Sequence, residues 1–192
     1  MTTDDNKSKL WQAAAELLGS SGRQAVIRVE GASMAPTFPP DTRILVDFAA
    51  RSPSMGDIIL FHQAGSLVVH RFLARIDSRR HGPCLRTRGD GIQALDPPLA
   101  DLDLLGRVIA CRRSGTWYRL DRAGARFWGV LAAIHDHLWA AVGVSVGRLR
   151  PVAWFLDRTG LRLGDRVLFR LLHRTMKPPD LAEIDLSAEG ML

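Results

Sequence analysis

The chain has 192 residues, 46% of them hydrophobic, and a formal net charge of +6. A chain of this length and apolar content can bury one substantial core together with an appendage. Its two cysteines, Cys84 and Cys111, exclude a disulfide framework. Each lies in a run typical of a strand, so they could be sheet neighbours, although two buried free thiols are the simpler expectation.

The positive charge comes from arginine far more than from lysine, and the isoelectric point lies near 10.3. An excess of this kind favours anionic lipid surfaces or nucleic acid as partners. No DNA- or RNA-binding motif accompanies the charge. We therefore expect no nucleic-acid partner and keep an anionic membrane surface as the alternative.

The first 21 residues form a polar tail and one short predicted helix. Residues 1–8 are polar, and the segment from Leu10 to Leu18 has amphipathic spacing, with Gly19 as the expected end of the helix. A helix of about ten residues does not span a bilayer, which takes about 20 apolar residues. The segment also lacks the pattern of a secretory signal peptide.

Residues 22–121 consist of short apolar or alternating runs separated by Gly, Pro and Asp clusters. This spacing is typical of an antiparallel sheet, so we predict a mainly β domain. Gln63-Ala64-Gly65-Ser66 predicts a hairpin connection. The expected strands are Val26–Val29, Arg43–Phe48, Asp57–His62, Leu67–Ala74, Leu85–Arg88, Arg107–Arg112 and Thr116–Leu120.

Residues 122–177 have a helical pattern without strand-like alternation, and 178–192 form an acidic tail. Phe127–Val146 is long enough to span a membrane, but His135-Asp136-His137 interrupts its middle, where an aspartate costs about 2.5–3.5 kcal/mol. We therefore expect a helical region that lies on an anionic membrane surface or packs as a cap on the β domain, rather than an integral span. The two histidines point in different directions on a helix, so we expect no metal site there.

The chemistry-bearing motif is Gly31-Ala32-Ser33-Met34-Ala35-Pro36-Thr37, which places a serine in a turn bounded by glycine and proline. Downstream, His70 stands in the β-type run Val68-Val69-His70-Arg71. Serine is a poor nucleophile until a neighbouring base takes its proton. The two motifs together therefore predict a nucleophilic Ser–His site.

These motifs resemble the superfamily of serine peptidases that contains signal peptidases and LexA, in which a Gly-x-Ser-Met-x-Pro-Thr box carries the nucleophile. The resemblance covers residues 25–112, where further segments match the successive family boxes in order. They are Pro40–Val46, Met55–Phe61, Val69–Arg71 and Arg88–Gly91. Residues 1–24 are too short for a helix-turn-helix domain ahead of these boxes, which counts against a LexA-type repressor.

Within this superfamily the chain is most similar to the endoplasmic-reticulum and archaeal branch of type I signal peptidase. Bacterial signal peptidases and LexA-type repressors carry a lysine where this chain has His70. The branch with histidine also has Gly-Asp followed six residues later by a second aspartate. Gly89-Asp90 and Asp96 match that interval.

The resemblance implies that Ser33 Oγ attacks the scissile carbonyl while His70 accepts its proton and returns it to the leaving amine. Asp90 and Asp96 would both belong to the site, and one of the two would orient the imidazole. The backbone N–H of Ser33 would stabilise the oxyanion, with Gly31 leaving room for the substrate. Met34 would pack in the core or line the substrate groove.

Each candidate also has an ordinary structural interpretation. Ser33 could stand in a simple turn, and His70 could be a half-exposed strand residue. Asp90 lies in a sequence that forms good β-turns in any protein, and Asp96 could merely begin a loop before Pro97-Pro98. It is the ordered set of motifs, rather than any one residue, that favours the catalytic interpretation.

We therefore expect a serine endopeptidase without an N-terminal membrane anchor, cytoplasmic or peripheral to a membrane, that needs no cofactor or metal. Its substrate would be an extended peptide or precursor protein with small residues next to the cut. Without an anchor, the target could be a cytosolic peptide or a maturing protein rather than a secretory precursor. Two alternatives are a non-catalytic peptide-binding relative and a membrane-surface adaptor; retention of the serine, the histidine and both aspartates counts against the first.

Overall fold

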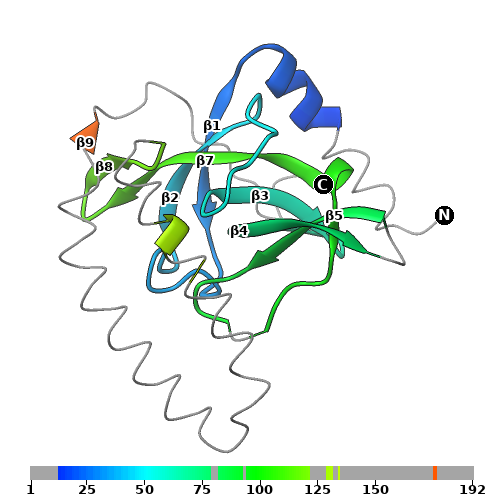
Figure 1. Cartoon of the computed structure of the whole chain (residues 1–192). Coiled ribbons are helices and arrows are strands. Elements are labelled where there is room, and N and C mark those ends of the chain that lie inside the picture. The colour runs from blue at the N-terminus through cyan, green and yellow to red at the C-terminus, as the bar shows by residue number, and fades with distance from the viewer. Residues whose placement is uncertain are drawn as a thin grey trace, which may run out of the picture.

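The apolar runs between residues 22 and 121 form strands that pair antiparallel into one curved sheet (Figure 1). The computed structural model describes residues 13–78, 82–92, 94–121, 129–131, 134 and 175–176. Its elements are β1 (Gln24–Val29), β2 (Thr42–Asp47), β3 (Ile58–Gln63), β4 (Ser66–Ser78), β5 (Gly82–Arg88), β6 (Leu99–Ala100), the 3-10 turn η1 (Asp101–Asp103), β7 (Leu104–Arg113), β8 (Thr116–Arg119) and β9 (Thr175–Met176). The predicted mainly β fold is confirmed.

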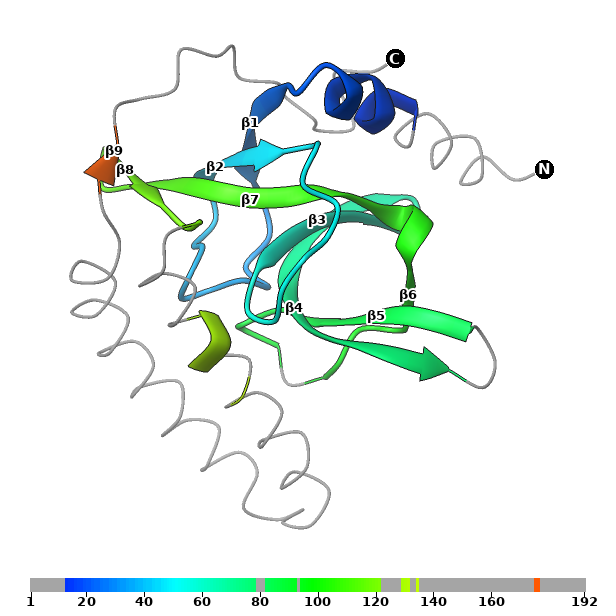
Figure 2. The same ribbon diagram turned by 45° about the horizontal axis from the view of Figure 1, so that its top comes forward.

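Strand β7 joins the two halves of the sheet. The strand order is β1-β2-β7-β3-β4-β5-β6, so β7 pairs with β2 along one edge and with β3 along the other. Strand β8 also pairs with β7, and β9 pairs with β8 (Figure 2). The register shifts between Leu45 and Val46 and again between Leu60 and Phe61. Register shifts of this kind bend the strands, which curves the sheet around its inner face.

The predicted hairpin at Gln63–Ser66 is confirmed, because Gln63 pairs with Ser66 at its base. Its two central residues, Ala64 and Gly65, have φ values of 49° and 78°. Two successive left-handed residues form the tight turn whose twist matches that of paired strands. This turn carries the chain from β3 directly into β4, the strand that bears His70.

The core lies on both faces of the central strands. The larger cluster includes Ile44, Val46, Ile58 and Leu60, together with Met34 from the loop after β1. A second cluster, centred on Phe61 and Leu85, fills the other side of β3 and β5. Since successive residues of β3 alternate between the clusters, the strand is buried on both faces, as its unbroken apolar sequence requires.

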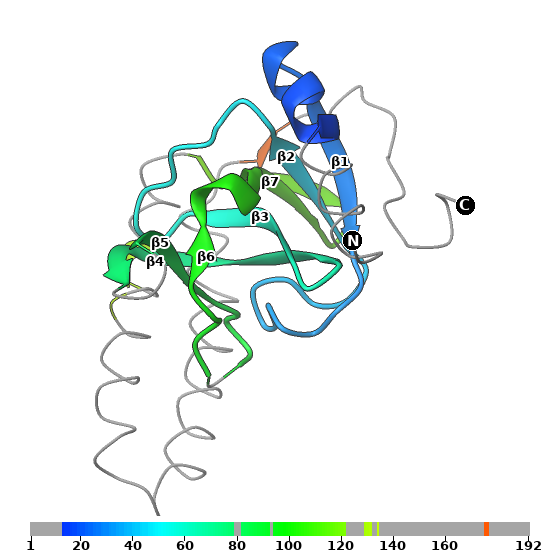
Figure 3. The same cartoon turned by 90° about the vertical axis from the view of Figure 1, so that its right-hand side faces the viewer.

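The N-terminal helix covers 13–20 and therefore continues through Gly19, where we had expected it to end (Figure 3). Gly22 ends it instead, with φ of 62°. The Gly22 N–H donates to the Gly19 carbonyl at 3.0 Å and the Arg23 N–H to the Leu18 carbonyl at 2.7 Å. This pair of bonds is the Schellman motif, which places the left-handed glycine three residues later than the pattern indicated.

Gly19 has a packing role in place of the capping role. A Cβ added there would lie 2.8 Å from the Phe48 carbonyl oxygen. The helix thus crosses the chain after β2 at a distance that only a glycine allows.

Other differences from the predicted elements fall at short strands and at strand ends. Strands β1, β4, β5 and β7 are longer than expected, and β6 was not predicted. Strand β9 contradicts the expectation that no strand follows residue 122, since Trp117 of β8 pairs with Met176. Two residues are too few to show an alternating pattern in the sequence. Such a strand forms because its neighbour has an edge with unpaired backbone groups.

The described parts of the C-terminal region are helical at 129–131 and 134, in agreement with the predicted pattern. The remainder of 122–192, including most of Phe127–Val146, both histidines at 135 and 137, and the acidic tail, lies outside the described residues, apart from β9. Among the residues that the structure describes, no helix has the length and apolar character that crossing a membrane requires.

Cys84 and Cys111 are buried free thiols, as the simpler expectation had it. Cys84 in β5 lies opposite Ile76 and Ala100, whereas Cys111 in β7 lies opposite Ile44 and Tyr118. The strand order separates the two thiols, so the alternative that they are sheet neighbours is wrong.

Gly19→Ala tests the close crossing of the helix. Alanine is about 1 kcal/mol better than glycine in a free helix, so propensity alone would stabilise the variant. Because the added methyl meets the Phe48 carbonyl, we expect destabilisation instead, by about 1–3 kcal/mol in urea unfolding. Glu16→Ala, at an exposed position of the same helix, should stay within about 0.5 kcal/mol of the wild type. A more stable Gly19→Ala variant would contradict the crossing.

Candidate active site

The loop from residue 30 to 41, here called the serine loop, holds Ser33 at the surface by burying its neighbours. Met34 and Phe38 are both 0% exposed and belong to the larger core cluster. The Phe38 N–H donates to the Met34 carbonyl at 2.8 Å, and the Asp41 N–H closes the loop on the Val29 carbonyl at 2.7 Å. Ser33, between the exposed start of the loop and these anchors, keeps part of its surface accessible.

His70 lies in β4 opposite Ile59 and is 5% exposed. Its Nδ1 is 2.7 Å from Asp96 Oδ2. The Thr87 hydroxyl donates to the same carboxylate oxygen at 2.6 Å, and the Asp96 N–H donates to the Thr87 carbonyl at 3.1 Å. Asp96 is therefore tied to β5 by backbone and side chain, and the imidazole is held by a carboxylate that itself has a fixed position.

The turn at Gly89–Ile92 brings the serine loop to the histidine. The Ile92 N–H donates to the Gly89 carbonyl at 3.0 Å, which closes a β-turn one residue later than the expected Arg88–Gly91, and the Gly91 N–H donates to the Ser33 carbonyl at 2.7 Å. In Figure 1 the serine loop and this turn lie together at the lower side of the sheet.

Gly89 lies between Ser33 and the imidazole. A Cβ added to it would be 2.6 Å from the Ser33 carbonyl oxygen and 2.9 Å from His70 Nε2. The Ser33 backbone and His70 Nε2 are therefore so close to Gly89 that a single methyl group placed there would touch both. Between the two side chains, both of which the structure describes, no hydrogen bond is formed. Such bonds are often loose in unliganded sites and tighten when substrate binds.

Asp90 forms no hydrogen bond or ion pair with the imidazole and is paired with Arg71 instead. Arg71 Nε donates to Asp90 Oδ1 at 2.9 Å and Nη2 to Oδ2 at 2.6 Å, while the Thr37 hydroxyl also donates to Oδ2. The two charged side chains are only 3% and 9% exposed. Of the two aspartates expected at the site, Asp96 holds the histidine. Asp90 is a buried anchor between β4, the serine loop and the turn that follows β5.

Of the other two predicted site residues, Gly31 lies at the surface beside the serine and Met34 lies in the core. Gly31 is exposed, and the nearest atom to a Cβ added there is, among the described residues, the Ser33 nitrogen at 4.0 Å, so these residues leave space before the serine. Met34 is fully buried, which corresponds to the packing alternative and not to a groove-lining side chain. Phe61 packs edge-on against the His70 ring, with ring centroids 6.0 Å apart.

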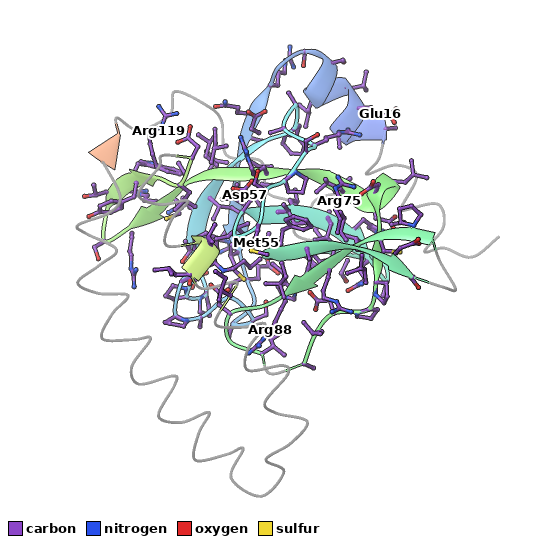
Figure 4. The ribbon with its side chains drawn as sticks, viewed as in Figure 1. Glu16, Met55, Asp57, Arg75, Arg88 and Arg119 are labelled. Carbon is purple, nitrogen blue, oxygen red and sulfur yellow. The ribbon has the colours of Figure 1, made fainter. Side chains whose placement is uncertain are left out.

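Sequence reasoning missed three residues with direct contacts in this arrangement: Thr37, Arg71 and Thr87. The first two stand inside the motifs quoted for the serine and the histidine, so their positions were a usable signal. No signal in the sequence pointed to Thr87, because it meets Asp96 only where the segment before β6 folds back along β5. Arg88, at the end of β5 in Figure 4, also supports the turn, since its Nε donates to the Ile92 carbonyl at 2.7 Å.

Within the part of the chain that is described, no group of three or more His, Cys, Asp or Glu side chains is placed to bind a metal ion. The reactive groups that the site brings together are the hydroxyl of Ser33, the imidazole of His70 and the carboxylate of Asp96. A carboxylate on Nδ1 holds the tautomer whose Nε2 carries a lone pair, the form that accepts a proton.

Comparison with known proteins supports the superfamily at a coarse level. A family model described as Peptidase S24-like matches residues 1–81. The matched part contains the serine loop and His70 but ends before Asp90 and Asp96. It supports the superfamily of LexA-type peptidases and a peptidase-type fold, without distinguishing one branch. No curated protein and no solved structure matches the chain.

Asp90→Ala measures the anchoring role of the buried pair. Removing one partner leaves a buried guanidinium uncompensated, so we expect a loss of about 3–5 kcal/mol in the free energy of unfolding. Asp101→Ala is the matched control, because Asp101 pairs with Arg75 at the surface, with both side chains about half exposed. That exposed pair should contribute at most about 1 kcal/mol. Equal losses in urea unfolding for the two variants would exclude the anchoring role.

Proposed function

We propose that this chain is a serine endopeptidase in which Ser33, His70 and Asp96 form the catalytic triad. The observation that carries the proposal is the 2.7 Å contact between His70 Nδ1 and Asp96, with Nε2 on the side of the imidazole that borders the serine loop. A buried histidine, backed by a fixed carboxylate and turned toward an accessible serine, is the arrangement that general-base activation needs.

In the proposed reaction Ser33 Oγ attacks the scissile carbonyl as His70 Nε2 takes the hydroxyl proton. Asp96 accepts the hydrogen bond from Nδ1–H throughout and stabilises the imidazolium that forms. The Ser33 N–H donates to the oxyanion, and His70 then protonates the leaving amine. Water, activated by the same imidazole, hydrolyses the acyl-enzyme. Asp90 takes no part in these proton transfers and acts by keeping the serine loop in place.

The histidine base favours, within the superfamily, the branch that includes endoplasmic-reticulum and archaeal type I signal peptidases. Among side chains, free imidazole ionises closest to neutral pH, so a histidine base needs no strong desolvation, whereas a lysine must be strongly desolvated before it can accept a proton. Support comes from His70, from Asp96 at the expected interval and from the contact between them. A peptide or precursor protein bound in extended form is the substrate class we propose, with the open space at Gly31 as its approach to the serine.

A fluorophosphonate probe tests the nucleophile directly. Ser33 Oγ attacks phosphorus, the P–F bond breaks, fluoride leaves and His70 takes the serine proton. We expect the wild type to be labelled and Ser33→Ala to remain unlabelled. Asp96→Asn should slow labelling by a factor of about 10⁴, because the amide favours the wrong tautomer.

Ser66→Ala and Asp101→Asn are the controls for this labelling, since both positions are exposed and separate from the site. Both should react at the wild-type rate. Labelling of Ser33→Ala, or an unreactive but folded wild type, would refute the peptidase proposal and favour a non-catalytic peptide-binding protein.

The anionic membrane surface expected for 122–177 is proposed as a second contact of the same protein. Its support is the net charge of +6, concentrated in arginine. We expect the chain to float with vesicles of anionic lipid at low salt and to be released at high salt, because screening shortens the reach of surface charges. Neutral vesicles should not bind. A lack of flotation with anionic vesicles at low salt excludes this contact.

A further inference from the structure

Two glycines far apart in the sequence pack backbone against backbone next to the site. A Cβ added to Gly129 would lie 2.5 Å from the Gly56 carbonyl oxygen, and one added to Gly56 would lie 2.3 Å from the Gly129 carbonyl carbon. Gly129 is buried and belongs to the helical residues 129–131. Figure 4 shows these helical residues close to Met55, the residue before Gly56. The crossing therefore fixes the helical segment against the turn that precedes β3.

Gly56 is connected directly to the strand that carries the histidine. Its carbonyl, the group that Gly129 covers, accepts a hydrogen bond from Arg71 Nη1 at 2.9 Å. Its N–H donates to the Phe72 carbonyl at 2.9 Å, and the Phe72 N–H donates to the Asp57 carbonyl at 2.8 Å. The turn at Gly56 is thus bonded to β4 beside His70, and any shift of this carbonyl moves the partner of the Arg71 guanidinium.

Arg71 passes this constraint to the serine. Its other two nitrogen donors hold the Asp90 carboxylate, which also accepts from Thr37 of the serine loop. The residue after Asp90, Gly91, donates its N–H to the Ser33 carbonyl at 2.7 Å. A guanidinium is planar and presents its donors in a fixed fork, so it cannot follow one partner without losing another.

We propose that Gly129 and Arg71 are positioning residues for the reaction: docking of 129–131 on Gly56 sets the guanidinium, and through Asp90 it sets Ser33 relative to His70. The proposal rests on the peptidase function above. Its physical basis is that a displacement of about 1 Å at the reacting atoms can cost a factor of about 10² in rate. The C-terminal region would thus support the active site rather than serve only as a surface for partners.

Gly129→Ala is the direct test, because alanine is the better helix former and harms the protein only where the methyl meets Gly56. We expect the rate constant for fluorophosphonate labelling to fall about tenfold or more. The matched control is Leu131→Ala, in the same helical segment, where the side chain is 41% exposed; it should be labelled at the wild-type rate. A folded Gly129→Ala protein that reacts at the wild-type rate would overturn the proposal.

A double-mutant cycle with Arg71→Lys separates positioning from a general loss of stability. Lysine keeps the charge but lacks the fork that joins Gly56 to Asp90. If both residues act through the same carbonyl, the double variant should react about as fast as the slower single variant. Losses that multiply would show two independent effects and contradict the proposal.

Hydrogen exchange gives a readout that does not depend on catalysis. The Gly91 N–H, bonded to the Ser33 carbonyl, should exchange faster in Gly129→Ala than in the wild type, while the amides between β1 and β2 stay protected. Should the variant fail to fold, the wild type in mild denaturant provides the same test: the amides of 129–131 and of Gly91 should lose protection together. Separate loss would overturn the proposal.

These experiments also distinguish the two proposals. A wild type that is not labelled refutes the peptidase function. Unchanged Gly91 exchange in the folded variant refutes the positioning role, whether or not the chain is a peptidase.

Discussion

The arrangement of the site depends on one buried ion pair, formed by Arg71 and Asp90. Two parallel hydrogen bonds join the guanidinium to the carboxylate, and both side chains are almost completely buried. Buried charges are tolerated only when their hydrogen-bonding groups are satisfied. Here a threonine of the serine loop and a carbonyl of the turn before β3 supply further hydrogen bonds to the pair. Meeting this requirement brings three separate segments together around the middle of β4.

The division of work between the two aspartates follows from the geometry of a strand. His70 and Arg71 are consecutive in β4, so their side chains point to opposite faces of the sheet. Each finds its own carboxylate in the chain that follows β5: Asp96 against the imidazole and Asp90 against the guanidinium. One aspartate can thus serve the proposed proton transfers while the other holds the nucleophile's loop. Two aspartates six residues apart therefore bind side chains on opposite faces of β4.

Glycines provide the close approaches that the site needs. Gly89 separates the serine backbone from the imidazole, and Gly91 packs against the Ala32, Ser33 and Ala35 carbonyls. Side chains at either position would push the serine loop away from β4. The motif Arg88-Gly89-Asp90-Gly91 therefore combines a turn, an anchor and the contact surface for the serine loop, which explains physically why these residue types occur together.

The sequence alone determined the β domain, the hairpin at Gln63–Ser66 and the candidate residues Ser33, His70, Asp90 and Asp96, because alternation, turn chemistry and motif order are local properties. Only the tertiary structure decided which aspartate meets the histidine, that Met34 is core, that Gly19 is a crossing point within its helix, and that Gly56 meets Gly129. Strand β9 also depended on a distant partner. Each of these outcomes is a contact between segments far apart in the chain, and local patterns do not contain the distances across which such segments meet.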